Sequence, residues 1–220
     1  MIQAVIFDID GTIIDSADLH IESWQRALKK FGKDSSYEKI RSQIGKGADE
    51  FLAEFFARDE LDRIRDDLED YRGKLFKDEY LPKVKAFPLV RELFERIKQD
   101  GKKIALASTA KEDEIKIYKE IARIEDLVDS VACSEDVKHS KPHRDICSAA
   151  VHKLGNIAPD RVIAVGDTRY DAEAAGKISV RTIGLLCGGG NREELHRAGC
   201  VAIYQDPAAL LLHYESSPLQ

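Results

Sequence analysis

The chain reads AVIFDIDGT over residues 4–12, where a short apolar run is followed directly by two acids. The apolar and partly β-branched residues 4–7 predict a buried strand. Because alternate side chains of an extended segment point the same way, Asp8 and Asp10 can reach one site where this strand ends. Gly11 would let the backbone turn tightly beside that site. The two carboxylates could bind a hard cation or divide attack and proton transfer between them; alternatively, both could be solvated caps of a turn.

Apolar strand-like runs alternate with helical patterns along the chain, as is typical of an α/β fold with a parallel sheet. The first strand and two later ones lead to a polar residue, namely Asp8, Ser108 and Asp167. In open α/β sheets, sites form beyond the carboxyl ends of the strands, so we expect these side chains to converge. The further strands are predicted at residues 103–107, 130–133, 162–165 and 180–186.

Residues 17–81 differ from the rest, because they contain no convincing strand and are patterned as successive helices. We expect a small helical domain at 17–81, inserted into an α/β domain made of residues 1–16 and 82–220. Mostly apolar side chains recur at helical spacing in three stripes: His20, Trp24, Ala27, Leu28 and Phe31; Phe51, Leu52, Phe55 and Phe56; and Leu61, Ile64, Leu68, Tyr71 and Leu75.

Local signals predict where these segments end. Gly32 is expected to end the first helix of the insert. Pro82 and residues 83–87 are expected to form the linker that returns to the α/β domain. The chain from about residue 215 is expected to fray.

The composition is that of a globular protein, with 43% hydrophobic and 34% charged residues among 220. The net charge of −6 argues against nucleic-acid binding, which normally uses a basic patch. The acid-rich run at residues 59–70 predicts a solvated helix face. The chain starts without a signal-peptide pattern and has no apolar stretch long enough to cross a bilayer, so we expect a cytoplasmic protein without a membrane partner. The cysteines form no CxxC pair, which argues against zinc and predicts reduced thiols; they are Cys133, Cys147, Cys187 and Cys200.

Two further positions carry groups that suit a phosphoryl oxygen. The hydroxyl of Ser108 and the amides after it can hydrogen-bond such an oxygen, and Thr109 could assist. Alternatively, Ser108 could cap a helix that starts near residue 112. Lys141 offers a point charge, and Pro142 fixes the backbone ahead of a predicted helix. An isolated lysine could equally be a solvated surface group.

The stretch GDTRYD at residues 166–171 follows the strand predicted at 162–165. Its two acids, Asp167 and Asp171, can form the other half of a cation site. Mg²⁺ prefers carboxylate and water oxygens in octahedral geometry. One such acid could merely cap a helix, but this explanation is poor for the whole set of motifs.

These motifs resemble those of the haloacid dehalogenase-like hydrolases. Residues 8–12 match the opening DxDGT pattern, Ser108 the second motif, Lys141 the third and residues 166–171 the GDxxxD pattern, in the required order. The helical insert resembles the cap of the subfamily that includes phosphoglycolate phosphatases, β-phosphoglucomutases, phosphonatases and dehalogenases. The resemblance implies a Rossmann-like, doubly wound parallel sheet with an inserted α-helical cap domain.

The resemblance also implies Mg²⁺-dependent phosphoryl transfer. Asp8 would be the nucleophile and form an aspartyl-phosphate. Asp10 would protonate the leaving group and then activate water. Mg²⁺ would bind Asp8, the backbone carbonyl of Asp10 and Asp167, with Asp171 as a direct or indirect partner.

Other residues would contact the substrate. Ser108 and Lys141 would hold the phosphoryl oxygens as charge redistributes, and Thr12 and Thr109 are assigned to substrate binding as well. Lys46 stands between two glycines in a loop of the insert. It could touch an anionic substrate group, or be a solvated lysine in a helix-helix turn.

Asp10 distinguishes between branches of the family. Dehalogenases, and usually phosphonatases, lack an acid there, so phosphate-ester chemistry is favoured. His20 and Trp24 resemble the arrangement in β-phosphoglucomutases, where a histidine could couple cap closure to catalysis; His20 could also merely border the cap core. Mutases tend to carry a Glu-Asp pair in the fourth motif, which reads GDTRYD in this chain, so a phosphatase is favoured over a phosphomutase.

We therefore expect a phosphatase that acts on a small phosphorylated metabolite, as a monomer or homodimer. Phosphoglycolate, sugar phosphates, nucleotides and pyrophosphate are all candidate substrates. A catalytically silent regulatory module is the alternative from another class, but it would predict a broken motif, and every motif is intact. Arg169, inside the fourth motif, could also meet substrate, although a surface position is favoured.

Overall fold

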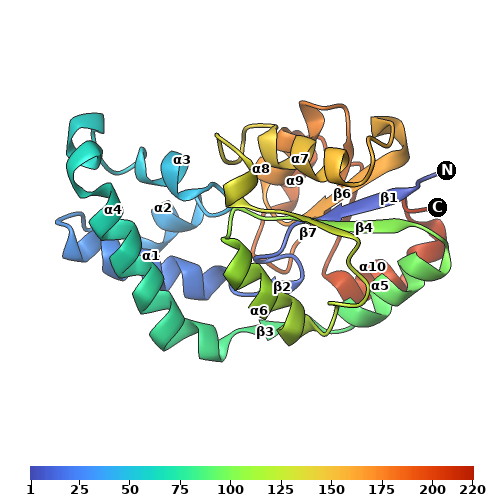
Figure 1. Ribbon diagram of the computed structural model, residues 1–220, viewed down its shortest axis with the longest axis horizontal. Helices are drawn as coiled ribbons and strands as arrows, with labels where there is room; N and C mark the ends of the chain where they lie inside the picture. Colours follow the sequence, from blue (N-terminus) through green and yellow to red (C-terminus); the bar gives the residue numbers. More distant parts are fainter.

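A six-stranded parallel sheet forms the centre of the α/β part of the protein in a computed structural model that describes residues 1–220 (Figure 1). The strand order is β5-β4-β1-β6-β7-β8. The register aligns Val5 of β1 with Ile104 of β4 on one side and with Ile163 of β6 on the other. The strands are β1 (Ala4–Phe7), β4 (Lys103–Ala107), β5 (Ser130–Ala132), β6 (Val162–Gly166), β7 (Arg181–Leu185) and β8 (Ala202–Tyr204).

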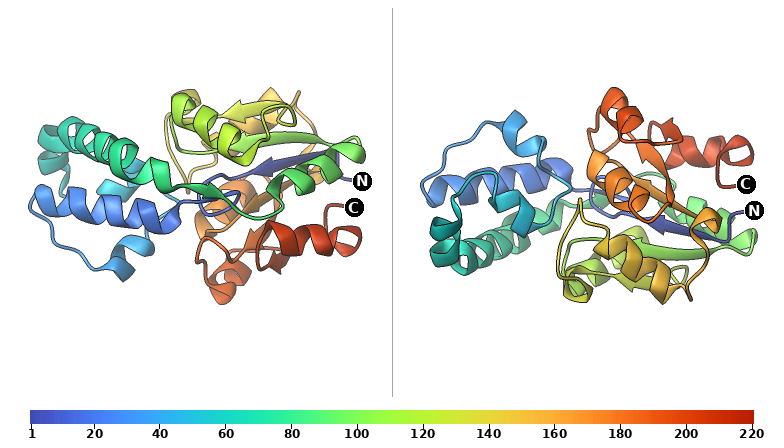
Figure 2. Two further views of the ribbon diagram at one scale, coloured as in Figure 1. Left: turned by 90° about the horizontal axis from the view of Figure 1, so that it is seen from below. Right: turned by 90° about the horizontal axis from the view of Figure 1, so that it is seen from above.

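Helices cover both faces of this sheet, because the central strands are apolar on both sides (Figure 2). Val5 and Phe7 belong to one buried cluster, whereas Ala4 and Ile6 belong to another. The predicted doubly wound α/β fold is therefore confirmed. The first cluster includes residues of α5 (Val90–Gln99), α6 (Glu112–Ala122) and α10 (Pro207–Leu212), the second those of α7 (Asp145–Lys153) and α8 (Arg169–Gly176), and α9 (Arg192–Arg197) contacts β8.

Four helices form a separate group beside the carboxyl ends of the central strands (Figures 1 and 2). They have a hydrophobic cluster of their own, which includes Trp24, Phe51 and Leu68. The division into a cap at 17–81 and a core of the remaining residues stays a prediction. The helices are α1 (Ala17–Lys30), α2 (Tyr37–Arg41), α3 (Ala48–Leu52) and α4 (Arg58–Leu75), and a π-helical turn (Phe76–Tyr80) and a 3-10 turn (Leu81–Lys83) follow α4.

A short antiparallel ribbon joins the two chain passages that lead into and out of this helical group. Strand β2 (Ile14–Asp15) pairs with β3 (Lys85–Ala86), and Ile14 lies opposite Ala86. The sequence predicts only a linker here, because two-residue strands leave no periodic pattern. Strand β8 is missed for the same reason, since its three residues are only half-buried.

Helix ends follow the predictions in part. Helix α1 ends at Lys30, and Gly32 has the left-handed φ of +85° that favours glycine, so its predicted role is confirmed. Helix α3 ends at Leu52, so Phe55 and Phe56 lie in the following turn rather than in a longer helix. None of the helices combines the length and the apolar composition that a bilayer crossing requires.

The C-terminal residues are packed against the core, so the prediction that they fray is wrong. Tyr214 is 2% exposed and Leu219 is fully buried. The Tyr214 hydroxyl donates to Asp100 at 2.9 Å, and Lys102 Nζ donates to the same carboxylate at 2.7 Å. Asp100 and Lys102 are distant from Tyr214 in the sequence. The local sequence of residues 215–220 therefore does not predict that the C-terminus packs against the core.

Candidate active site

Three carboxylates meet at the carboxyl ends of β1 and β6. Asp8 directly follows β1, Asp167 directly follows β6, and Asp171 lies in the first turn of α8. One oxygen of each lies within 4.8 Å of the others. Thr12 Oγ1 donates to Asp167 at 2.9 Å. The structure therefore brings together the acids of the first and fourth motifs.

Lys141 lies among these acids and is 3% exposed. Its Nζ is 2.5 Å from Asp8 Oδ1 and 2.8 Å from Asp171 Oδ1, and it donates to the carbonyl of Ala107 at 3.1 Å. Burial alone would lower the pKa of this lysine, but Asp171 and Asp8 together raise it. Lys141 is therefore a fixed positive charge beside the predicted nucleophile.

Crowding of the carboxylates leaves negative charge that one lysine does not neutralise. Burial, together with the charge of Asp171, raises the pKa of Asp8 to about 7, although Lys141 opposes the shift. Burial and the charges of Asp171 and Asp8 raise the pKa of Asp167 well above its usual value. A bound cation would relieve this repulsion.

Two glycines let the backbone close tightly around Asp167. A Cβ atom on Gly188 would lie 1.9 Å from Asp167 Oδ2, and one on Gly11 would lie 2.4 Å from the same oxygen. The donors in this cradle are all oxygens, the set that Mg²⁺ prefers. The residues present therefore fit a hard divalent cation.

The Asp10 carboxylate lies outside this group and faces α1. Its Oδ1 accepts a hydrogen bond from Ser16 Oγ at 2.6 Å and lies 2.8 Å from His20 Nε2. Burial favours a higher pKa for Asp10, but His20 and Ser16 outweigh it, so the pKa lies below its ordinary value. Only the backbone carbonyl of Asp10 is thus left for the metal role that the resemblance implies.

Arg72 fixes the tautomer of His20. A terminal nitrogen of its guanidinium contacts His20 Nδ1, and a guanidinium can only donate hydrogen bonds. Nδ1 must therefore accept, so the proton resides on Nε2, which donates to Asp10. Arg72 Nε also lies 3.3 Å from Ser23 Oγ. No sequence motif marks Arg72, which lies on α4, 62 positions along from Asp10.

Ser108 and Thr109 follow β4 at the same edge of the sheet. Ser108 is 1% exposed, and its Oγ accepts a hydrogen bond from the amide of Ala110 at 3.1 Å. Helix α6 begins after Lys111, so Ser108 closes the strand-helix turn rather than capping the helix itself. Its role in holding a phosphoryl oxygen stays a prediction.

The loop around Lys46 approaches the core closely. A Cβ atom on Gly45 would lie 2.6 Å from Thr168 Oγ1, and one on Gly47 would lie 2.2 Å from Ser140 Cβ. The glycines therefore permit the approach that the sequence predicts. Lys46 itself pairs with Glu54 at 2.6 Å, so an anionic substrate would have to compete for it. Its role in substrate binding stays a prediction.

Arg169 lies on the surface, as the sequence favours. The residue is exposed, and its guanidinium donates to the hydroxyl of Tyr170 at 2.9 Å. That hydroxyl donates in turn to the carbonyl of Ser42 at 2.7 Å, which links the fourth motif to the helical group. Arg169 thus contacts the tyrosine that joins the fourth motif to the helical group, and the structure gives it no other role.

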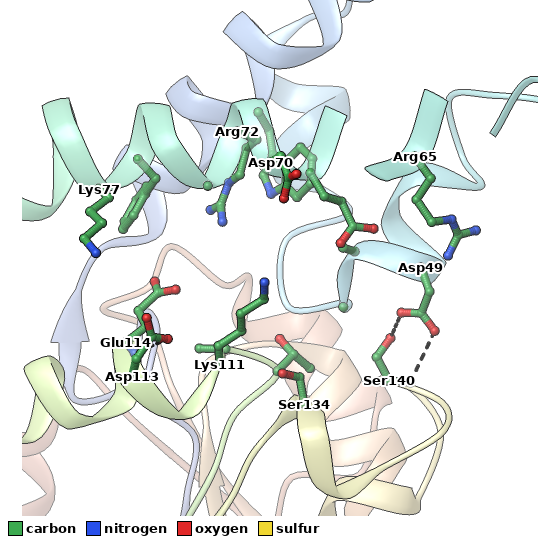
Figure 3. Close-up of a pocket in the computed structure, with 18 of the residues that line it drawn as sticks. Asp49, Arg65, Asp70, Arg72, Lys77, Lys111, Asp113, Glu114, Ser134 and Ser140 are labelled. Carbon is green, nitrogen blue, oxygen red and sulfur yellow. Dashed lines mark hydrogen bonds between the residues drawn. The ribbon is translucent and has the colours of Figure 1, made fainter. Parts of the chain in front are cut away.

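A cavity of about 670 Å³ opens between the helical group and the α/β part (Figure 3). Thr109 and Ser140 line it, and each is adjacent in the chain to a predicted phosphoryl-binding residue, Ser108 or Lys141. The Arg72 side chain points from α4 into this space, and the Lys111 side chain points into it from the opposite side (Figure 3). The cavity therefore opens beside the loops that carry Ser108 and Lys141.

Comparison with known proteins agrees with this geometry. Residues 5–185 match the family described as Haloacid dehalogenase-like hydrolase. A phosphorylated carbohydrates phosphatase of Thermotoga maritima is 27% identical over 205 residues, covering 91% of this chain and 93% of the relative. The pyrophosphatase PpaX of Bacillus cereus is 25% identical over 171 residues, covering 77% and 76%. The crystal structure of a hydrolase from Pseudomonas syringae has a TM-score of 0.85, with 26% identity and coverage of 97% and 98%.

The chain belongs to the haloacid dehalogenase-like hydrolase family, because the match spans most of its length and includes the strands and loops that carry the site. The resemblance inferred from the motifs is thereby confirmed.

Proposed function

We propose that this protein is a Mg²⁺-dependent phosphatase of a small phosphorylated metabolite. The observation that carries the proposal is the placement of Asp8, which contacts Lys141, groups with two further acids and lies on the same strand-end loop as Asp10. The names of the phosphatase relatives point in the same direction.

In this proposal the reaction proceeds in two displacements. An oxygen of Asp8 forms a bond to phosphorus, and the bond to the leaving oxygen breaks as that oxygen takes a proton from Asp10. Water then attacks phosphorus, its proton passes to Asp10, and the bond to Asp8 breaks. Because the pKa of Asp10 is low in the free protein, the acid role requires that the bound phosphoryl charge raise it.

The surrounding residues hold the transferring group. Lys141 would neutralise Asp8 and a phosphoryl oxygen, and Ser108 would donate to another. Mg²⁺, held by Asp8, Asp167, Asp171 and the Asp10 carbonyl, would neutralise charge on nucleophile and phosphoryl group. His20 and Arg72 would set the position of Asp10, so that proton transfer depends on residues of the helical group.

The helical segment at 17–81 would act as a cap over the core. Its contacts with the strand-end loops, such as Tyr170 with Ser42, support closure over a small substrate. The four cysteines are free, which suits a reducing, cytoplasmic setting.

Phosphate release from small phosphoesters tests the proposal. The panel contains β-glucose 1-phosphate, phosphoglycolate and p-nitrophenyl phosphate, each assayed with Mg²⁺ and with EDTA, and Asp8→Asn is the matched control. We expect Mg²⁺-dependent release that disappears in Asp8→Asn. Absence of release from every ester would overturn the proposal, and transfer between two sugar phosphates without net hydrolysis would favour a phosphomutase instead.

A further inference from the structure

A carboxylate of the helical group binds the residue that directly precedes Lys141. Asp49 of α3 and Ser140 both line the cavity, and their side chains point toward each other (Figure 3). The Ser140 hydroxyl donates to one oxygen of the Asp49 carboxylate, and the Ser140 amide donates to the other at 3.5 Å. One carboxylate therefore accepts hydrogen bonds from both donors of this serine.

The contact between Asp49 and Ser140 is tight and lies largely away from solvent. Ser140 is 8% exposed, and neither of its donors has another acceptor in the protein. Gly47, directly before α3, leaves room for the serine, because a Cβ atom there would lie 2.4 Å from Ser140 Oγ. A hydrogen bond to a carboxylate is stronger than one between neutral groups, so Asp49 fixes the position of Ser140.

The backbone on either side of Lys141 is held by different parts of the protein. Ser140 directly precedes Lys141, whose Nζ is 2.5 Å from Asp8. Lysine carries its charge on a flexible four-carbon stem, so the position of the ammonium depends on the backbone from which the stem starts. After Lys141, the carbonyl of Pro142 accepts a hydrogen bond from Lys177 at 2.7 Å, a contact within the α/β part. The anchor before Lys141 comes instead from the helical group.

The second contact of α3 with this loop is weaker. Glu50 Oε1 lies 3.2 Å from His143 Nε2, but the two side chains are 37% and 47% exposed. Solvent screens such a pair, so it contributes little to holding the loop. Asp49 is therefore the side chain of α3 that holds the loop of the third motif.

We propose, building on the phosphatase function proposed above, that Asp49 is a positioning residue of the reaction: by binding Ser140 it fixes the backbone from which Lys141 reaches Asp8 and a phosphoryl oxygen. Lys141 acts on the nucleophile and the phosphoryl group, which all phosphoester substrates share. Asp49 therefore affects all of them alike, whatever their leaving group.

Hydrolysis of two substrates with different leaving groups tests this proposal. We expect Asp49→Ala and Ser140→Ala each to lower kcat/KM about tenfold, and by the same factor for p-nitrophenyl phosphate and glucose 6-phosphate, because a hydrogen bond to a charged group is lost. The double variant should fall little further than the single ones, since both remove the same contact. Asp49→Asn, which keeps an acceptor for the Ser140 hydroxyl, should recover part of the activity.

Nitrogen NMR of the Lys141 ammonium gives a readout that does not depend on turnover. Its signal is assigned by its absence in Lys141→Arg. We expect a distinct signal in the wild type, because Nζ is buried among fixed partners, and a broadened or shifted signal in Asp49→Ala. Urea titration of the same samples shows that the variants are folded.

Asp70→Ala is the matched control. Asp70 lines the same cavity from α4 but forms no hydrogen bond or ion pair, so its removal takes away the same charge without touching Ser140 (Figure 3). It should leave kcat/KM within about twofold of wild type and the Lys141 signal unchanged, as expected for an acid without a partner.

An unchanged Lys141 signal in Asp49→Ala, or kcat/KM within twofold of wild type for both substrates, would overturn the proposal for Asp49. A loss confined to glucose 6-phosphate would also overturn it, because Asp49 would then act on the leaving group. Absence of release from every substrate by the wild type would refute the phosphatase function, whereas the Lys141 signal would still show whether Asp49 positions this lysine.

Discussion

Replacing Arg72 by methionine should slow hydrolysis of alkyl phosphates much more than hydrolysis of p-nitrophenyl phosphate. Arg72 contacts His20 Nδ1, and His20 Nε2 lies 2.8 Å from the Asp10 carboxylate. Without the guanidinium, His20 can take either tautomer, and its bond to Asp10 is no longer enforced. An alkoxide needs the proton that Asp10 delivers, whereas nitrophenolate leaves without one.

The magnitude follows from the bond that is lost. A hydrogen bond to a charged group contributes about 1.5–3 kcal/mol. Since about 1.4 kcal/mol corresponds to a factor of ten, the ratio of kcat/KM for glucose 6-phosphate to kcat/KM for p-nitrophenyl phosphate should fall about 10- to 100-fold. This ratio reports departure of the leaving group and is independent of the second displacement, which both substrates share. Methionine retains aliphatic packing against Trp24 and Phe76, so most of the loss should come from the missing donor.

Two measurements distinguish this relay from simple damage to the fold. Nitrogen NMR of His20 should show the proton on Nε2 in the wild type and a mixture of tautomers in Arg72→Met. Arg72→Lys, which retains a charged donor, should recover part of the kcat/KM ratio. Equal slowing of both substrates, with an unchanged His20 spectrum, would refute the reasoning.

Three further changes probe the metal cradle and the core. Gly188→Ala places a methyl group against Asp167, so the Mg²⁺ concentration for half-maximal activity should rise about 10- to 100-fold, measured by Mg²⁺ titration; an unchanged value would contradict the cradle. Asp100→Asn should lower the free energy of unfolding by about 1 kcal/mol at neutral pH in urea titrations. Bonds from Lys102 and other partners lower the pKa of Asp100 in the folded state, so this contribution is present above the unfolded pKa of about 3.9 and should shrink as the pH falls below it; a difference that grows in acid would contradict the assignment. Leu219→Ala should cost about 2–5 kcal/mol in the same titrations, whereas a cost near zero would mean that the tail is not anchored.

Three of the four catalytic motifs could be predicted because each is a local pattern at the end of an apolar strand. Asp8, Ser108 and Asp167 follow β1, β4 and β6, which are neighbours in the sheet. A parallel sheet brings such positions to one edge, so the strand pattern alone implies that they converge. The sequence therefore contains both the residues and the reason for their proximity.

Other features depend on contacts that no local pattern encodes. Arg72 lies on an amphipathic helix whose sequence does not show that it meets His20. The buried position of Leu219 depends on a hydrophobic cluster assembled from elements throughout the chain. Strands β2 and β3 are too short for periodicity and exist because two distant passages lie side by side.

The cap loop shows an intermediate case. Glycines around Lys46 predict a close approach, and the contacts of Gly45 and Gly47 with the core agree with it. The partner of Lys46 could not be predicted, because Glu54 lies in an irregular turn after α3. The sequence thus predicts the close approach of the loop backbone, but it does not predict which side chain Lys46 contacts.

Direct detection of a phosphoryl group on Asp8 is the most decisive measurement. Asp10→Asn removes the base for the second displacement but still permits p-nitrophenolate to leave, so the intermediate should accumulate. We expect peptide mass spectrometry of acid-quenched Asp10→Asn, incubated with p-nitrophenyl phosphate and Mg²⁺, to find one phosphoryl group on the peptide that contains Asp8. The same treatment of an Asp8→Asn, Asp10→Asn double variant should find none. Release of nitrophenolate without any adduct, or an adduct on another residue, would contradict the account.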